Sequence, residues 1–133
     1  MNAIGHLNYC RCLSHYFYQT LFCCHWLKKK NKVGLGSGGH EDLERAIRTQ
    51  GNFAEYVPIG IILIACLELN GAPWWLVAIP GIALIVGRLI HAKGMNTPPP
   101  DFSKRVLGMK FTFFTLIALA ALNLGWSLRY LAN

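Results

Sequence analysis

The feature that most limits how this chain can fold is a polar helical face that leads directly into an apolar segment. Residues 44–58 read ERAIRTQGNFAEYVP, and the chain turns almost wholly apolar beyond them. At about 3.6 residues per helical turn, the residues that share one narrow face are Arg45, Arg48, Asn52 and Glu55, with Tyr56 beside them. In a membrane, each such charge costs about 2.5 to 3.5 kcal/mol unless it is paired, faces a protein cavity or binds a ligand. We therefore expect this face to join a polar network between helices, to meet a second subunit or to bind a charged molecule.

The composition indicates a small integral membrane protein. Apolar residues make up 53% of the 133 residues, and charged residues only 14%. A net charge of +7 could suggest a nucleic-acid partner. However, the basic residues lie beside apolar segments, where the preference of lysine and arginine for the cytoplasmic side of a membrane explains them better. We expect a lipid bilayer as the surrounding medium and no nucleic-acid partner.

The order of apolar segments and breaks predicts an all-α fold, a transmembrane four-helix bundle that forms a single domain over residues 1–133. The helices are expected at about 4–27, 40–69, 73–93 and 103–131, joined by cytoplasmic loops at 28–39 and 94–102. Nearly all lysines and arginines fall in these loops or at the adjacent helix ends. The positive-inside rule then places both termini outside the cytoplasm.

The first of these helices is the poorest membrane segment. It contains Asn8, Arg11 and three histidines among its apolar residues, and no compact cleavable signal peptide is recognisable. The cysteines and histidines that could suggest a metal site are Cys10, Cys12, His15, Cys23, Cys24 and His25. Their spacing is not that of known zinc modules, and on a helix they scatter around the circumference, so we expect no metal.

The run from Glu44 to Pro58 resembles the signature of the MAPEG family, the membrane-associated proteins in eicosanoid and glutathione metabolism. The resemblance continues through the third and fourth segments, covering about residues 28–130, and is greatest to the small bacterial members. It implies a four-helix bundle that assembles as a homotrimer in the bacterial inner membrane. It also implies that glutathione binds between subunits near the cytoplasmic side.

The resemblance also assigns roles to individual residues. The residues that match glutathione-holding positions are Arg48, Asn52, Glu55 and Tyr56, with Gln50 from the neighbouring subunit and Arg88 retained from the family pattern. Lys28 or Lys29 stands where other members have arginine, and Arg105 matches the residue that stabilises the thiolate. Physically, glutathione carries two carboxylates and an ammonium, so its site needs at least two cations and one anion.

Two positions depart from the pattern of the conjugating members. His91 and Met95 stand where those members have tyrosines at the end of the third segment, and His91 alone is typical of an interfacial residue near a helix end. The favoured function is a glutathione transferase or peroxidase acting on hydrophobic small molecules. The alternatives are a non-catalytic scaffold or binding protein of the same fold and, less favoured, a small multidrug exporter, which also needs a buried carboxylate.

Overall fold

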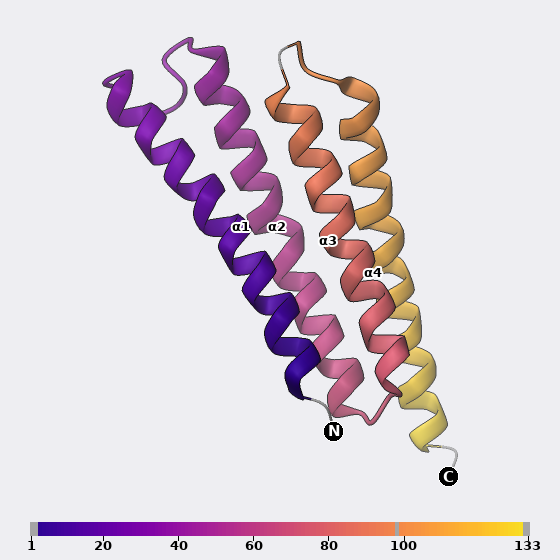
Figure 1. Ribbon diagram of the computed structural model, residues 1–133. Coiled ribbons are helices and arrows are strands. Elements are labelled where there is room, and N and C mark those ends of the chain that lie inside the picture. Colours follow the sequence, from indigo (N-terminus) through magenta and orange to yellow (C-terminus); the bar gives the residue numbers. More distant parts are fainter. Residues whose placement is uncertain (1–2, 98, 132–133) are drawn as a thin grey trace.

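Four helices lie side by side in the computed structural model, which describes residues 3–97 and 99–131, with side chains for residues 14–95, 97 and 99–129. The helices are α1 (Ala3–Lys30), α2 (Glu41–Leu69), α3 (Trp74–Asn96) and α4 (Phe102–Leu131). Both long loops lie at one end of the bundle, and both termini lie at the other (Figure 1). The all-α four-helix prediction is confirmed.

Two helices extend further toward the loops than the sequence indicated. α1 continues through Lys28, Lys29 and Lys30. These cations fall in its last turn, where they interact favourably with the negative end of the helix dipole. α3 continues to Asn96, and Thr97 closes it by donating from both its backbone N–H and its hydroxyl to the carbonyl of Lys93, at 3.2 and 2.6 Å. The loops are correspondingly shorter than expected.

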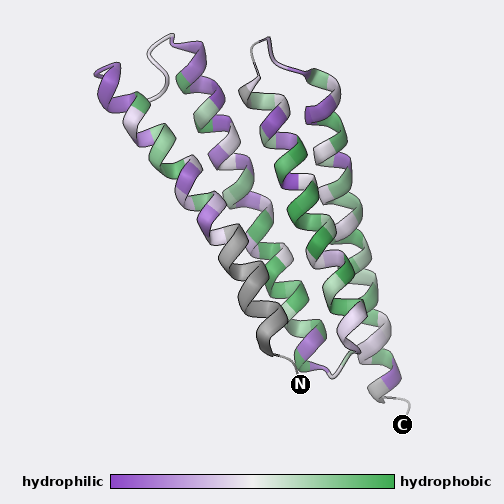
Figure 2. Ribbon diagram, viewed as in Figure 1, coloured by the Kyte–Doolittle hydropathy of each residue, from purple (hydrophilic) through white to green (hydrophobic). Residues whose placement is uncertain are grey.

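Three of the helices are suited to a membrane. α2, α3 and α4 are each long and apolar enough to cross a bilayer, judged by length and composition. In Figure 2 the hydrophobic colour is strongest along α3 and α4 and over the half of α2 farther from the loops, while hydrophilic residues gather at the loop end. The described part of α1 is not among the apolar candidates, in line with its mixed composition.

α1 attaches to the bundle through aromatic side chains. The rings of Tyr16 and Phe17 lie 5.4 and 5.5 Å from the ring of Phe53 on α2. Their packing gives α1 a protein partner along its middle turns.

α3 and α4 approach each other most closely at glycines. A methyl group added at Gly108 would lie 2.5 Å from the backbone nitrogen of His91 and 2.7 Å from the carbonyl oxygen of Gly87. Small residues at a helix crossing let two backbones come together, which is how membrane helices gain packing contacts without a hydrophobic driving force. This contact fixes the position of α3 residues relative to α4.

Asp101 caps the start of α4 and should contribute to stability in a pH-dependent way. Its carboxylate accepts from the backbone N–H of Lys104 at 3.1 Å and lies 2.7 Å from the Lys104 ammonium. Hydrogen bonds from the side chain and backbone of Lys104 lower the pKa of Asp101 below its usual value of 3.8. A lowered folded-state pKa stabilises above the unfolded value and loses that effect as the pH falls through the folded value.

We therefore expect Asp101→Ala to lower the thermal midpoint in detergent at pH 7, and Asp101→Asn, which keeps a capping oxygen, to lower it less. The difference between the native chain and Asp101→Ala should shrink at pH 3. A difference that is the same at both pH values would show that the capping contact does not depend on the charge.

Candidate functional site

The centre of the candidate site is Arg88 of α3, which is only 3% exposed. Its Nη1 donates to the side-chain oxygen of Asn52 and lies 3.4 Å from the Asn52 carbonyl oxygen. Its Nη2 donates to the hydroxyl of Thr112 at 2.5 Å and lies 3.4 Å from the sulfur of Met109. One guanidinium thus joins α2, α3 and α4.

Helical spacing explains how these partners converge. Asn52 and Tyr56 are one turn apart on α2, and the Arg88 guanidinium lies 5.9 Å from the centre of the Tyr56 ring. That ring in turn meets Phe113 edge-on at 5.2 Å. On α4 the Thr112 hydroxyl donates to the carbonyl of Gly108 at 2.9 Å, so its oxygen is oriented to accept from Arg88.

All the partners recorded for the Arg88 guanidinium are neutral. Among the described residues no carboxylate pairs with it. Its Nε and the hydroxyl of Tyr16 are both buried without a hydrogen-bond partner among the described residues. A buried cation whose partners are all neutral is the strongest functional indication in this fold, because an unpaired charge is costly in a membrane protein.

Arg48 and Glu55 do not share a site within one chain. Both Nε and Nη2 of Arg48 lie 3.0 Å from one carboxylate oxygen of Glu44, an exposed ion pair one turn away. Glu55 is exposed and has no ion pair or hydrogen bond among the described residues. The two charges therefore point to the outer surface of α2, where a second subunit or a ligand could meet them.

The remaining predicted residues lie around the loop end of the bundle. Gln50 and Lys28 are half-buried, and Lys29 is exposed. Arg105 is half-buried on the first turn of α4, with its guanidinium 6.0 Å from the Phe102 ring. In the described part of the chain, no hydrogen bond or ion pair joins any of these residues to Arg88.

His91 and Met95 are buried, at 5% and 2% exposure. His91 had suggested an interfacial position from the sequence, but Gly108 lets α4 cover it. His91 therefore belongs to the contact between α3 and α4, and Met95 is buried in the protein.

Sequence reasoning missed three contributors to the site. Thr112 and Met109 contact Arg88 from α4, and Tyr16 of α1 packs on Phe53, the residue after Asn52. A signal was present for Thr112, because it follows Gly108 by one helical turn, on a face of small and hydroxyl residues that is typical of membrane-helix contacts. Tyr16 gave no such signal, since it lies in the least regular segment.

The metal ligands considered from the sequence fall only partly within the described side chains. Those of Cys10 and Cys12 lie outside them. Among the described residues there is no group of three or more histidine, cysteine, aspartate or glutamate side chains placed to hold a metal ion.

Comparisons with known proteins agree with the sequence resemblance. The chain matches the model of the MAPEG family over residues 18–125. It is 41% identical to the inner membrane protein YecN of Escherichia coli K12 over 98 residues, which cover 74% of this chain and 73% of that protein. The same protein from Escherichia coli O6:H1 strain CFT073 matches equally well.

Proposed function

Because the chain belongs to the MAPEG family of integral membrane proteins, we propose that it binds glutathione in the inner membrane and activates its thiol toward hydrophobic electrophiles. The observation that carries the proposal is the buried Arg88 guanidinium, whose recorded partners are all neutral. A cation held in apolar surroundings is stabilised by an anion that comes close to it. A carboxylate of glutathione would supply that charge.

The proposed site needs more than one chain. Arg48 and Glu55 lie on the outside of α2, so a ligand that touched both and Arg88 would have to fill a space closed by a neighbouring subunit. In a homotrimer, Arg48 and a loop lysine, Lys28 or Lys29, would hold the carboxylate of the peptide that Arg88 does not bind, and Glu55 would hold its ammonium. Gln50 would reach the site from the adjacent subunit.

Arg105 has the chemical role in this proposal. A cysteine thiol has an ordinary pKa near 8.5, and lowering it by two units corresponds to about 2.7 kcal/mol of preference for the thiolate. A guanidinium near the sulfur in a partly dry site can supply this. The thiolate then attacks the electrophilic carbon of a chlorinated aromatic compound, the sulfur–carbon bond forms, and chloride leaves with the bonding electrons.

The test is a glutathione titration of the reconstituted protein that follows thiolate absorbance and product formation together. Arg105→Gln should still bind glutathione but lose the thiolate signal and turnover. Arg129→Gln, which alters an arginine at the opposite end of the same helix, is the matched control and should behave like the native chain. Loss of the thiolate in both variants, or in neither, would contradict the role of Arg105.

The proposed assembly has its own test. Glu55→Lys places a cation where the ligand ammonium would lie, so glutathione binding should be lost, and chemical cross-linking should show whether trimers persist. If this variant kept both trimers and glutathione binding, Glu55 would be neither a ligand contact nor a subunit contact, and the proposed site would be wrong.

A second candidate is a binding protein of this fold without catalysis. It is favoured by one observation: His91 and Met95, which have no hydroxyl and stand at the positions of the family tyrosines, are both buried. Glutathione binding without thiolate formation in the same titration would support this candidate over the enzyme.

A further inference from the structure

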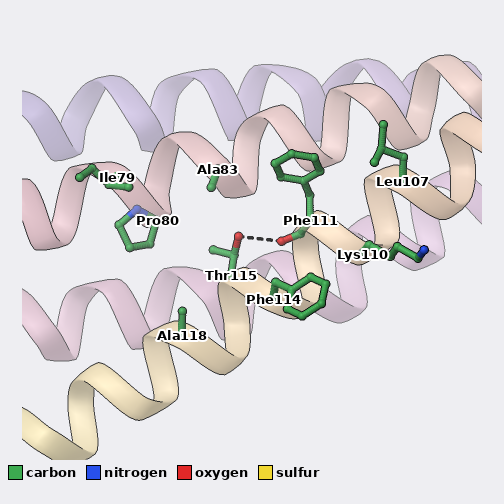
Figure 3. A pocket seen from close by; sticks show the side chains of 9 residues that line it. All are labelled: Ile79, Pro80, Ala83, Leu107, Lys110, Phe111, Phe114, Thr115 and Ala118. Carbon is green, nitrogen blue, oxygen red and sulfur yellow. Dashed lines mark hydrogen bonds between the residues drawn. The ribbon is translucent and has the colours of Figure 1, made fainter.

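An open apolar groove of about 430 Å³ runs between α3 and α4 (Figure 3), and Arg88 is not among its lining residues. Its walls include Ile79, Pro80 and Ala83 of α3 and Phe111, Phe114 and Ala118 of α4. Ile79 and Phe114 are 61% and 70% exposed, so the groove opens to the outside of the chain. The hydroxyl of Thr115 in its wall donates to the carbonyl of Phe111 at 2.7 Å and is therefore already satisfied. The surface offered to an occupant is hydrocarbon.

The groove has one charged residue, and it lies at one end. Lys110 belongs to the lining, and in Figure 3 its ammonium points away from Ala118, toward the side where Leu107 lies. The loops and the cationic helix ends, with Lys93, Lys104 and Arg105, are on that same side of the bundle. An occupant that matches this arrangement has a long apolar part and an anionic group at one end.

The length of the groove fits one leaflet of a bilayer. From Lys110 to Ala118 the helix rises about 12 Å, which is within the roughly 15 Å depth of half a hydrocarbon core. The uncharged run from Phe111 to Leu128 is about 27 Å long, close to the full thickness of that core. Lys110 therefore stands where hydrocarbon gives way to headgroups.

We infer that this groove binds an acyl chain of an anionic phospholipid, with the phosphate held by Lys110. The groove ends near the middle of the bilayer, as the acyl chain of a lipid does. A helix from a second copy would instead need a complementary apolar face along the full thickness of the membrane. A cation beside the headgroups attracts anionic lipid over neutral lipid. The inference concerns a surface separate from the glutathione site and does not depend on that proposal.

The experiment uses the full chain in phosphatidylcholine vesicles that contain a trace of photoactivatable lipid, either phosphatidylglycerol or phosphatidylcholine, with the reactive group on one acyl chain. After irradiation, mass spectrometry locates the labelled residues. Phosphatidylglycerol should label the groove walls on α3 and α4 in preference to the exposed face of α2. Labelling by phosphatidylcholine at the same residues should be weaker.

Two variants separate the tail from the headgroup. Ala118→Trp fills the groove and should abolish its labelling, whereas Ala120→Trp, at an exposed position outside the lining, should leave the labelling unchanged. Lys110→Gln should lower phosphatidylglycerol labelling about fivefold, the effect of losing one cation near an anionic headgroup. It should leave phosphatidylcholine labelling unchanged.

Three results would overturn the inference. The first is labelling spread evenly over the outward faces of the helices, and the second is equal labelling of the groove by the two lipids. The third is labelling that survives Ala118→Trp. Absence of labelling at these residues by either lipid, together with cross-linking of two chains there by a separate bifunctional reagent, would instead assign the groove to a subunit contact. Lys110→Gln tests the inference without changing the apolar walls of the groove. Its result can therefore be interpreted even if Ala118→Trp fails to fold.

Discussion

Replacing Gly108 with alanine is expected to destabilise the bundle by about 1 to 3 kcal/mol, the range for overpacking a tight contact. The new methyl group would lie 2.5 Å from the backbone nitrogen of His91 and 2.7 Å from both its Cα and the Gly87 carbonyl oxygen. These are backbone atoms, so no side chain can rotate away, and α3 and α4 must separate. Reversible unfolding in mixed micelles measures the change.

Gly125 of the same helix provides the matched control. No heavy atom lies within 4 Å of the position that its methyl group would occupy. Gly125→Ala should therefore stabilise α4 by up to about 1 kcal/mol, because alanine loses less backbone entropy than glycine in a helix. Equal effects of the two substitutions would mean that the two helices are not in backbone contact at Gly108.

The separation of α3 from α4 caused by Gly108→Ala should also alter the candidate site. Thr112, one turn beyond Gly108, accepts from Arg88 across the same helix contact. Moving α4 outward would lengthen this hydrogen bond and uncover His91. We expect Gly108→Ala to weaken glutathione binding as well as stability, although position 108 itself would touch no ligand.

Much of the fold could be predicted because its signals are local. The length of each apolar run, the turn at residues 70–73 and the basic stretches beside the apolar segments each fix a helix or a loop without reference to the rest of the chain. The prediction that polar residues share one face of α2 near its N-terminal end needed only the spacing of Arg48, Asn52 and Glu55. The last three residues of α1, Lys28 to Lys30, were assigned to the loop because a lysine run was taken as a stop rather than as a favourable helix end.

The partners within the site could not be predicted in the same way. Arg48 could reach Glu44 at a spacing of four or Glu55 at a spacing of seven, and only the first lies one turn away, where side chains meet directly. Arg88 reaches Asn52 and Thr112 because three helices are placed by the glycine contact. That placement depends on packing between segments far apart in sequence, which no local pattern contains.

Replacing Asn52 with leucine is expected to be among the most costly changes within the membrane region. The Asn52 side-chain oxygen accepts from Nη1 of Arg88, and leucine of similar size would leave that donor facing apolar atoms. Leaving a buried donor unpaired costs about 1 to 3 kcal/mol, and more when the donor is charged. Unfolding in mixed micelles should show a loss in this range, larger than the loss caused by Arg88→Met.

The double variant Asn52→Leu with Arg88→Met completes a thermodynamic cycle. Removing both members of a buried polar pair can be nearly neutral, so the double variant should be more stable than Asn52→Leu alone, with a coupling energy of about 0.5 to 3 kcal/mol. Additive losses would show that Asn52 does not stabilise the guanidinium.

Glutathione then distinguishes a structural arginine from a ligand-binding one. At a hundred times its dissociation constant, a ligand stabilises the native chain by about 2.7 kcal/mol. If the positive charge of Arg88 attracts the peptide, the double variant should fold but gain none of this stabilisation. If glutathione still stabilised the double variant, Arg88 would serve only to join three helices. The carboxylates of glutathione would then have to be bound by Arg48, Arg105 and the loop lysines.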